Sequence, residues 1–430
     1  MTPAPRADGA WEEWRTGWPL VLASFVGFIG AGAQIYVLSV TLGPLTAAHH
    51  WPRAVAAAPM TIYAVGVLAL AAPIGTLVDR VGPRRVALAG APLAGLAFSL
   101  VGLSGAAIWT WMLAWTGFAA VALSIGPLVW CPALVRHFRS TRGLALGVAM
   151  SGSGLAGFIW PPISLWCMQH GGTAGAFEAV GGVIGVVGGL VVGLLFRGPA
   201  TGPAPASAPA PLPAAPHPTG SGLAAVLRTP LFWRISLVLM LVSGVVSGVM
   251  VHVSAFATDR GFSAVQAARV LAIFGPALIV GRLAVGLLLD RVPGRAVVVA
   301  LLVVAFAACV LLATFDGRPT TLWAAAVLIG LANGAETDLL GFLLARHFGS
   351  GNFGSVYGAG LSIFSLGYGL APAMVGASFD YAGSYVPACL VACAALAACA
   401  PLALGLPGSQ AGRRGGVPGA AEGSAGGPRG

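Results

Sequence analysis

Long apolar runs follow one another along almost the whole chain, and they constrain its fold more than any other feature. Each run has the roughly 20 residues that a helix needs to cross a hydrocarbon core about 30 Å thick. Only 8% of the 430 residues are charged and the mean hydropathy is +0.90, whereas a soluble domain carries roughly 25% charged residues. The sequence therefore predicts an all-α protein of a lipid bilayer with twelve transmembrane helices, near residues 18–44, 54–77, 85–105, 107–134, 143–168, 174–196, 232–257, 264–288, 295–315, 319–345, 353–379 and 385–405.

Polar segments divide the apolar runs into two sets of six. Between the sets lies a stretch rich in proline and alanine (PAPASAPAPLPAAPHP), which cannot bury a core and is typical of a flexible linker. A glycine-rich polar tail follows the second set and predicts disorder. The expected domains are a cytoplasmic N-terminus (1–17), a six-helix bundle (18–197), a cytoplasmic linker (198–229), a second six-helix bundle (230–407) and a disordered cytoplasmic tail (408–430).

The arginines are distributed unevenly around the apolar runs. With the N-terminus inside, the inner segments carry 17 of the 22 basic residues, and the outer segments carry Arg53, Arg260, Arg269 and Arg318. Because arginine is enriched in cytoplasmic segments, we expect both termini in the cytoplasm and the chain in the cell membrane, specifically a bacterial inner membrane. The net charge of +10 does not indicate nucleic-acid binding, since the arginines stand singly between apolar runs.

The two sets of runs are internal repeats. The segment GTLVDRVGPRR (75–85) is echoed by GLLLDRVPGR (286–295), at an offset of 211 residues. Arg-His-Phe at 136–138 recurs at 346–348, and several glycines and a proline further on keep the same spacing. Two similar six-helix bundles in one chain are an architecture of secondary transporters.

The repeated loops resemble the signature loop of the major facilitator superfamily, which follows the second helix and again the eighth. The resemblance covers nearly the whole chain and implies the major facilitator fold. In that superfamily the loop belongs to a cytoplasmic charge network that holds one conformation. The resemblance thus implies a gating role for Gly75, Asp79, Arg80, Arg84, Asp290, Arg291 and Arg295. The alternative is that these arginines serve only as cytoplasmic anchors of the topology.

A closer resemblance is to the monocarboxylate-porter and oxalate/formate-antiporter branch. Its marks are Arg-Gly-Leu-Ala-Leu-Gly at 142–147, His252 followed by Phe-Ala-Thr-Asp-Arg-Gly-Phe at 256–262, Arg282, Arg-His-Phe-Gly at 346–349 and Gly-Ser-Tyr at 383–385. The resemblance implies a small organic anion as substrate, with protons as the coupling ion. Leu278 stands where some proton-coupled porters have an aspartate, and the chain lacks the lysines that branch members use. One basic anchor favours a monocarboxylate over a dicarboxylate.

Arg282 is the one charge in the apolar run near 264–288 that stands at membrane depth. A charge at mid-membrane costs at least about 2.5 kcal/mol, so it should face a central cavity. It precedes Asp290, at the cytoplasmic end of the helix, by eight residues, which places it about 12 Å deeper, near the midplane. Guanidinium grips carboxylate in a two-pronged fork, so Arg282 is the leading substrate ligand. A structural ion pair with Glu336 or Asp338 is the alternative.

Glu336 and Asp338 are candidates for proton coupling. They stand two apart on one predicted helix, so their side chains diverge by about 200° and cannot both face one partner. A buried carboxylate near an arginine is poised between proton gain and loss. Helix packing, or a place in a cytoplasmic vestibule, is the alternative. His252, near the external end of its run, could bind substrate or relay protons, since histidine titrates near neutral pH. The further candidates for substrate binding are polar or aromatic groups within the runs, each, like His252, also compatible with ordinary packing: Gln34, Tyr36, Tyr63, Trp130, Asn333 and Tyr357.

These features favour a proton-linked monocarboxylate symporter that works by alternating access, as a monomer. An efflux pump for amphipathic or other non-acid compounds is the second hypothesis, and a membrane sensor that has lost transport is a third. The six cysteines lie in apolar runs without metal-ligand spacing, and no catalytic cluster stands out. We therefore expect no metal, no cofactor and no enzymatic activity.

Overall fold

The computed structural model describes residues 7–138, 141–196, 223–289, 291–348 and 353–407, and within them the chain is helical without strands. Proline stands in the first turn of α3, α4, α6 and α10, where its fixed φ suits a helix and its missing amide is not needed. The helices of the first half are α1 (Ala7–His49), α2 (Arg53–Ala57), α3 (Pro59–Val81), α4 (Pro83–Gly102), α5 (Ile108–Ala122), the 3₁₀ turn η1 (Leu123–Ile125), α6 (Pro127–His137), α7 (Arg142–Met150) and α8 (Gly152–Leu195).

The second half consists of a short helix and six long ones. They are α9 (Leu223–Leu227), α10 (Pro230–Asp259), α11 (Ala264–Leu289), α12 (Gly294–Ala313), α13 (Pro319–Phe348), α14 (Phe353–Ala382) and α15 (Val386–Leu404). Over the described residues, eleven helical stretches are long and apolar enough to cross a membrane. One of them is interrupted at Gly172, whose φ of 67° and ψ of −169° only glycine adopts readily. The break makes two spans, and the predicted set of twelve is confirmed.

The structure corrects several details of the predicted organisation. The spans expected at 107–134 and 143–168 are each built from two helices, which meet at η1 and at Ser151. Part of the predicted N-terminal segment is helical, because α1 begins at Ala7. Most of the predicted linker lies outside the described residues. Its last part, LAAVL, forms α9 rather than a flexible chain, because Val226 is buried.

The contacts between the two halves are made by pairs of helices that the internal repeat relates to one another. α8 packs against α11, and α3 packs against α14. The offset of 211 residues carries α3 onto α11 and the first part of α8 onto α14, so these two contacts are equivalent. α1 packs against α10, its own counterpart. The halves are thus related by an approximate two-fold axis, as repeats of parallel topology are.

Glycines bring the helices of the two halves into close contact. A Cβ atom added to Gly157 would lie 2.9 Å from the backbone of Gly275, and one added to Gly154 would lie 2.9 Å from the carbonyl oxygen of Gly275. Small residues at such crossings allow the backbones to touch. Gly143 and Gly147, earlier in the same apolar run, have open space beside them. The small-residue pattern therefore marks a contact only in the part of the span that α8 forms.

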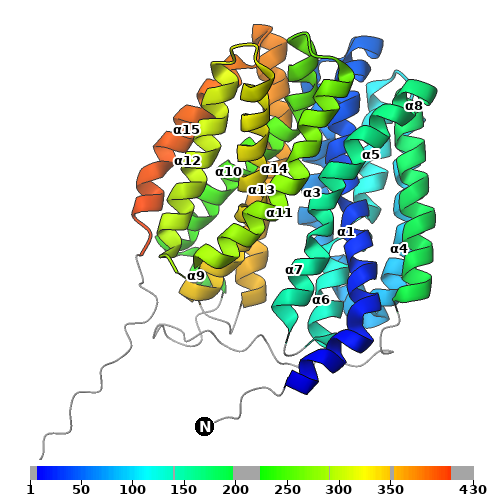
Figure 1. Cartoon of the computed structure of the whole chain (residues 1–430), viewed down its shortest axis with the longest axis vertical. Coiled ribbons are helices and arrows are strands. Elements are labelled where there is room, and N and C mark those ends of the chain that lie inside the picture. Colours follow the sequence, from blue (N-terminus) through cyan, green and yellow to red (C-terminus); the bar gives the residue numbers. More distant parts are fainter. Residues whose placement is uncertain (1–6, 139–140, 197–222, 290, 349–352, 408–430) are drawn as a thin grey trace, which may run out of the picture.

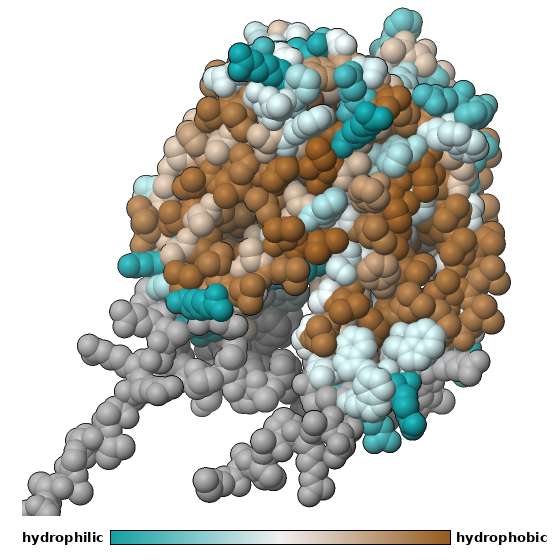
Figure 2. Space-filling view, in the orientation of Figure 1, coloured by the Kyte–Doolittle hydropathy of each residue, from teal (hydrophilic) through white to brown (hydrophobic). Residues whose placement is uncertain are grey.

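The surface has the distribution of polarity that a lipid environment requires. Apolar residues cover the middle of the molecule, and polar residues gather toward its two ends (Figure 2). α1 begins and α15 ends at the same end of the bundle, here named the terminal end (Figure 1). The opposite end, named the distal end, carries residues 50–52, 103–107, 260–263, 314–318 and 383–385. The structure thus matches a multi-pass membrane protein.

Contacts between the halves are concentrated toward the distal end. There a Cβ atom on Gly376 of α14 would lie 2.5 Å from the amide nitrogen of Ala54, and Gly43 of α1 faces Ala255 of α10. Toward the terminal end, α6 and α7 pack chiefly against helices of their own half. Among the described residues, the bundle is closed distally and looser at its terminal end.

The close crossing of α14 and α10 gives a test of the fold. We expect Gly367→Ala to destabilise the protein by about 1–3 kcal/mol, because a Cβ atom there would collide with the backbone of Met240. Gly358→Ala on the same helix is the matched control, since nothing lies within 4 Å of its Cβ position, and it should be neutral or stabilising. The apparent unfolding temperature of the purified protein in detergent measures both. Equal shifts for the two variants would contradict the packing described here.

Candidate functional site

Arg282 lies on α11 and joins the two halves of the molecule. Its Nη1 donates a hydrogen bond of 3.1 Å to the main-chain carbonyl oxygen of Met150, in the first half. Its Nε lies 3.1 Å from Oδ2 of Asp338, on α13 in the second half. The Arg282 side chain is 13% exposed and that of Asp338 34%, so water reaches the carboxylate more readily. Of the two ion pairs considered from sequence, the one with Asp338 is present.

The Met150 carbonyl is available because a helix break follows it. α7 ends at Met150 and α8 starts at Gly152, after the turn at Ser151. At this turn the amide of Gly154 bonds to the carbonyl of Ser151, three residues back. The carbonyl oxygen of Met150 accepts from the Ser153 hydroxyl at 2.7 Å as well as from Arg282. The break thus creates an acceptor for a charge on the other half.

Three further side chains lie within electrostatic range of Arg282. They are Glu336 of α13, Cys131 of α6 and Tyr357 of α14. Tyr357 is among the residues expected at the site, whereas nothing in the apolar sequence around Cys131 marks it. Arg282 is therefore surrounded by α6, the end of α7, α13 and α14. This is a site between the halves, built from groups far apart in the chain.

Glu336, two residues before Asp338 on α13, is 1% exposed and also lies within electrostatic range of Arg282. Its Oε2 has no hydrogen-bond partner among the described residues, and it lies within electrostatic range of Tyr368 on α14. The same tyrosine lies near Tyr36 and Tyr63 of the first half. Two residues of separation on a helix give the expected divergence of the two carboxylates. Asp338 pairs with Arg282, whereas Glu336 lies within electrostatic range of both Arg282 and Tyr368.

The tyrosine group extends the site into the first half. Tyr63 interacts with the side chain of Gln34, and the buried Oε1 of Gln34 has no hydrogen-bond partner among the described residues. Gln34, Tyr36 and Tyr63 are lining residues expected from sequence, and the structure brings them together. Tyr368 was not predicted as a lining residue. It lies in the apolar run 353–379, so the criterion that selected Tyr36 and Tyr63 could have found it.

Two other predicted lining residues have partners of their own. Trp130 is 1% exposed, its indole Nε1 donates to the carbonyl of Ile125 at 2.7 Å, and its ring packs against Phe196. It packs in the core of the first half, which hydropathy could not distinguish from a position that lines a cavity. Asn333 donates to the sulfur of Met250 at 3.3 Å, a weak bond within the second half.

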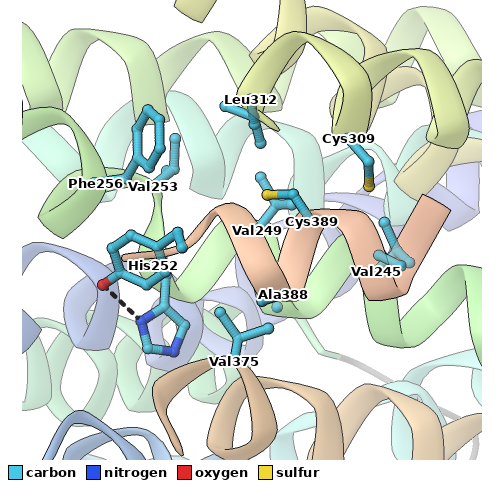
Figure 3. A pocket seen from close by; sticks show the side chains of 13 residues that line it. Val245, Val249, His252, Val253, Phe256, Cys309, Leu312, Val375, Ala388 and Cys389 are labelled. Atoms are coloured by element: carbon cyan, nitrogen blue, oxygen red, sulfur yellow. Dashed lines mark hydrogen bonds between the residues drawn. The ribbon is translucent and has the colours of Figure 1, made fainter. Parts of the chain in front are cut away.

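His252 lies at the distal end rather than beside Arg282. It is 2% exposed, its Nδ1 lies 3.2 Å from the Tyr385 hydroxyl and its Nε2 lies 2.8 Å from the carbonyl oxygen of Pro372. It borders a small apolar pocket of about 50 Å³ (Figure 3), far below the several hundred cubic ångströms of a ligand site. The structure does not support the predicted substrate contact of His252.

A cluster at the distal end is not anticipated by the sequence. Arg53 of α2 forms a two-pronged ion pair with Asp259 of α10, with distances of 2.6 and 2.9 Å, and also donates to the Tyr385 hydroxyl. Asp380 of α14 accepts hydrogen bonds from the backbone amides of Arg53 and Ala54. Burial raises the pKa of the Tyr385 phenol. One segment of the first half is thereby held by three elements of the second.

The repeated signature loops lie at the terminal end. Gly75 and Gly286 have open space around them. The Asp79 side chain and Asp290 lie outside the part of the chain that the structure describes in detail. The remaining members of the predicted network have exposed side chains: Arg80, Arg84, Arg291 and Arg295. Their gating role stays a prediction.

Comparisons with known proteins agree with this arrangement. The sequence model of the Major Facilitator Superfamily matches residues 22–372. The chain is 27% identical to "Monocarboxylate transporter 13" of Bos taurus over 406 residues, which cover 93% of this chain and 90% of that one. It is 28% identical to "Monocarboxylate transporter 11" of Mus musculus over 427 residues, covering 95% and 90%.

Solved structures resemble the fold at lower identity. A bacterial homolog of the human lysosomal transporter Spinster, in an inward-facing and occupied conformation, has a TM-score of 0.69 at 16% identity and covers 93% of this chain and 97% of its own. A mutant of the nucleoside transporter NupG has a TM-score of 0.72 at 13% identity and covers 90% and 99%. At these identities the likeness concerns the fold alone.

Two six-helix bundles around a shared charged site define a membrane transporter. The match of the family model over most of the chain identifies it further: the protein belongs to the major facilitator superfamily. Among the branches of that superfamily, it is similar to the monocarboxylate transporters. The family and the fold inferred from sequence are thereby confirmed.

The Arg282–Asp338 pair predicts a measurable coupling in stability. We expect Arg282→Gln and Asp338→Asn to destabilise the protein singly, and the double variant to recover about 0.5–3 kcal/mol relative to additivity, because each single change leaves an uncompensated charge. Arg318 and Asp316 form an exposed pair, 78% and 42% exposed, and the same cycle there should give a coupling near zero. Unfolding temperatures of the variants supply the comparison, and additivity at both pairs would refute the buried ion pair.

Proposed function

We propose that this chain is a secondary active transporter that moves a small monocarboxylate across the cell membrane by alternating access, coupled to protons. The observation that carries the proposal is the place of Arg282, an always-charged group held between the halves by a carboxylate and a backbone carbonyl. Similarity to proteins named monocarboxylate transporters supports the substrate class. Arg282 would bind the substrate carboxylate through its fork of N–H donors.

Asp338 is the group that we assign to proton coupling. While ionised, it occupies Arg282 as a counter-charge at 3.1 Å. A proton on Asp338 removes that charge and frees the guanidinium for a substrate carboxylate. The exchange keeps the charge of the site constant, because one anion replaces another as the partner of Arg282. Leu278 stands on α11 where related porters carry an aspartate, and Asp338 would supply the carboxylate from α13 instead.

The rest of the substrate would lie toward the tyrosine group of Tyr36, Tyr63 and Tyr368, next to Gln34. Phenol and amide groups there provide hydrogen-bond donors for a hydroxyl or keto oxygen and flat surfaces for a short carbon chain. Glu336 sits at the same place, and its Oε2 has no hydrogen-bond partner among the described residues. It is the second candidate for a protonated group.

The terminal end would face the cytoplasm, in line with the excess of arginine in the segments there. Under this orientation the molecule is closed toward the outside and looser toward the inside. Alternating access would then bring the two signature loops together, with Gly75, Asp79, Arg80 and Arg84 meeting their counterparts Asp290, Arg291 and Arg295 across the gap. The proposal describes a transporter without a cofactor, and not an enzyme.

A second candidate function is efflux of amphipathic compounds without an acid group. The observation that favours it is the uncharged tyrosine group, which offers aromatic surface on both halves. Such a pump would use Arg282 and Asp338 only as a proton-sensitive ion pair. Competition by neutral aromatic compounds, without competition by monocarboxylates, would select this function.

Uptake into proteoliposomes tests the role of Arg282. A labelled monocarboxylate should accumulate when the vesicle interior is made alkaline, and Arg282→Lys should reduce the rate by more than about tenfold, because an ammonium cannot replace the two-pronged grip. Size-exclusion profiles of the purified variant show whether it has folded. Uptake that ignores the pH gradient, or a folded Arg282→Lys variant with the wild-type rate, would refute the proposal.

Replacing the carboxylates separates coupling from binding. Asp338→Asn mimics the protonated group, so we expect it to lose gradient-driven accumulation while it retains exchange of labelled for unlabelled substrate. Glu336→Gln is the matched control on the same helix and should keep the response to the gradient. If Glu336→Gln uncouples transport and Asp338→Asn does not, the proton site lies in the tyrosine group instead.

A further inference from the structure

The distal cluster is the most highly connected contact between the halves among the described residues. We name it the distal latch and define it as Arg53, Asp259, Asp380, Tyr385 and His252. Arg53 alone comes from the first half, and its guanidinium also lies over the ring of Phe379, 3.7 Å from the centroid. Because one arginine and its backbone amide hold α10, α14 and the start of α15, the distal end cannot open while these bonds persist.

The hydrogen bonds of the latch have a fixed direction that depends on neutral His252. The carbonyl oxygen of Pro372 only accepts, so Nε2 of His252 carries the hydrogen that bonds to it at 2.8 Å. In the neutral ring Nδ1 is then an acceptor, and the Tyr385 hydroxyl donates to it at 3.2 Å (Figure 3). The phenol oxygen in turn accepts from Arg53. Arg53 thus donates to Tyr385, Tyr385 donates to His252, and His252 donates to the carbonyl oxygen of Pro372.

Protonation of His252 reverses the direction of its hydrogen bond with Tyr385. The imidazolium has two N–H donors and no acceptor, so the Tyr385 hydroxyl can no longer donate to Nδ1. The phenol oxygen would then stand between two cationic donors, Arg53 and His252. The two halves of the molecule would compete for the same acceptor, which weakens the hold of Arg53.

The charges around the imidazole belong to the groups that hold the two halves together. The latch contains one arginine and two carboxylates, Asp259 and Asp380, so it carries an excess of one negative charge while His252 is neutral. Arg53 and both carboxylates lie within electrostatic range of His252, and each carboxylate already binds the Arg53 segment. An imidazolium would draw on these carboxylates and loosen their bonds to the first half. The other titratable groups that border the same pocket are the thiols of Cys309 and Cys389, which carry no charge to oppose it.

The proton would reach His252 from the distal surface. The pocket on its other side is lined by apolar side chains such as Val249 and Leu312, and it offers no chain of polar groups. Asp259 is the most exposed charged member of the ion pair, at 33%, against 12% for Arg53. Tyr385, which bonds to His252 and lies within electrostatic range of Asp259, would connect the imidazole to water at that end.

We propose that His252 is a proton-binding residue whose protonation releases the distal latch and opens the distal end. This goes beyond the proposed transport function, because it assigns a second proton site, separate from Arg282 and Asp338, that controls access and not substrate binding. It holds whatever the substrate is. With the distal end outside, external acid would favour the outward-open state.

A distance measurement on the full chain without substrate tests the proposal. Genetically encoded spin labels at Gly105 and Arg318, exposed loop positions on the two halves at the distal end, report opening by pulsed electron resonance in lipid nanodiscs. We expect the long-distance population to rise at least about fivefold between about pH 8 and pH 5, because an imidazole that water reaches in the open state titrates in this range. A distribution that does not change with pH would overturn the proposal.

Variants identify the group that responds. His252→Gln can donate to the Pro372 carbonyl and accept from Tyr385 without binding a proton, so it should stay closed at all pH values; His252→Asn replaces it if that variant does not fold. Tyr385→Phe breaks the order of donors and should be more open already at about pH 8. His49→Gln is the matched control, because His49 also lies at the distal end but stacks on Trp51. A pH response that survives in His252→Gln, or that disappears in His49→Gln, would refute the assignment.

Discussion

The hydrocarbon interior of the bilayer offers no hydrogen-bond partners, and the whole structure follows from that constraint. Backbone groups must be satisfied within helices, and side chains facing lipid must be apolar. The few charges of the chain are then confined to its two ends and to the space between the halves. Arg282, Asp338 and Glu336 occupy that inner space, and the ion pair of Arg53 with Asp259 lies at its distal end. Polar chemistry and movement between the halves are therefore located in the same places.

The number and position of the spans could be predicted because hydropathy and helix length report directly on the constraint imposed by lipid. The repeat at an offset of 211 residues further predicted that the halves are equivalent, and the exchanged contacts of α3 with α14 and of α8 with α11 agree. The break at Gly172 falls between two predicted spans, whereas the one at Ser151 could not be foreseen, since it interrupts a helix inside an apolar run. α9 was not predicted because its five residues are too few to show the periodicity of a helix.

The site was predictable as a set of residue types and not as a set of contacts. Arg282 and the two carboxylates stand out because ionised groups are expensive within an apolar run. Which carboxylate faces the arginine depends on helix rotation, which sequence spacing alone leaves open. Trp130 has the composition of a lining residue and lies in the core, because its partner is a backbone carbonyl. The distal latch joins residues more than 200 positions apart, and no local sequence pattern predicts such a contact.

The bond from Arg282 to the carbonyl of Met150 has a consequence for how this protein can vary. Its acceptor is the main chain, so the identity of the side chain at position 150 is irrelevant to it. What maintains the bond is the interruption of the helix one residue later, together with a serine two positions beyond that. A substitution that straightened this turn would remove a contact between the halves without touching either charged residue. Relatives can thus share the contact while differing at the position that makes it, and a comparison of side chains would overlook it.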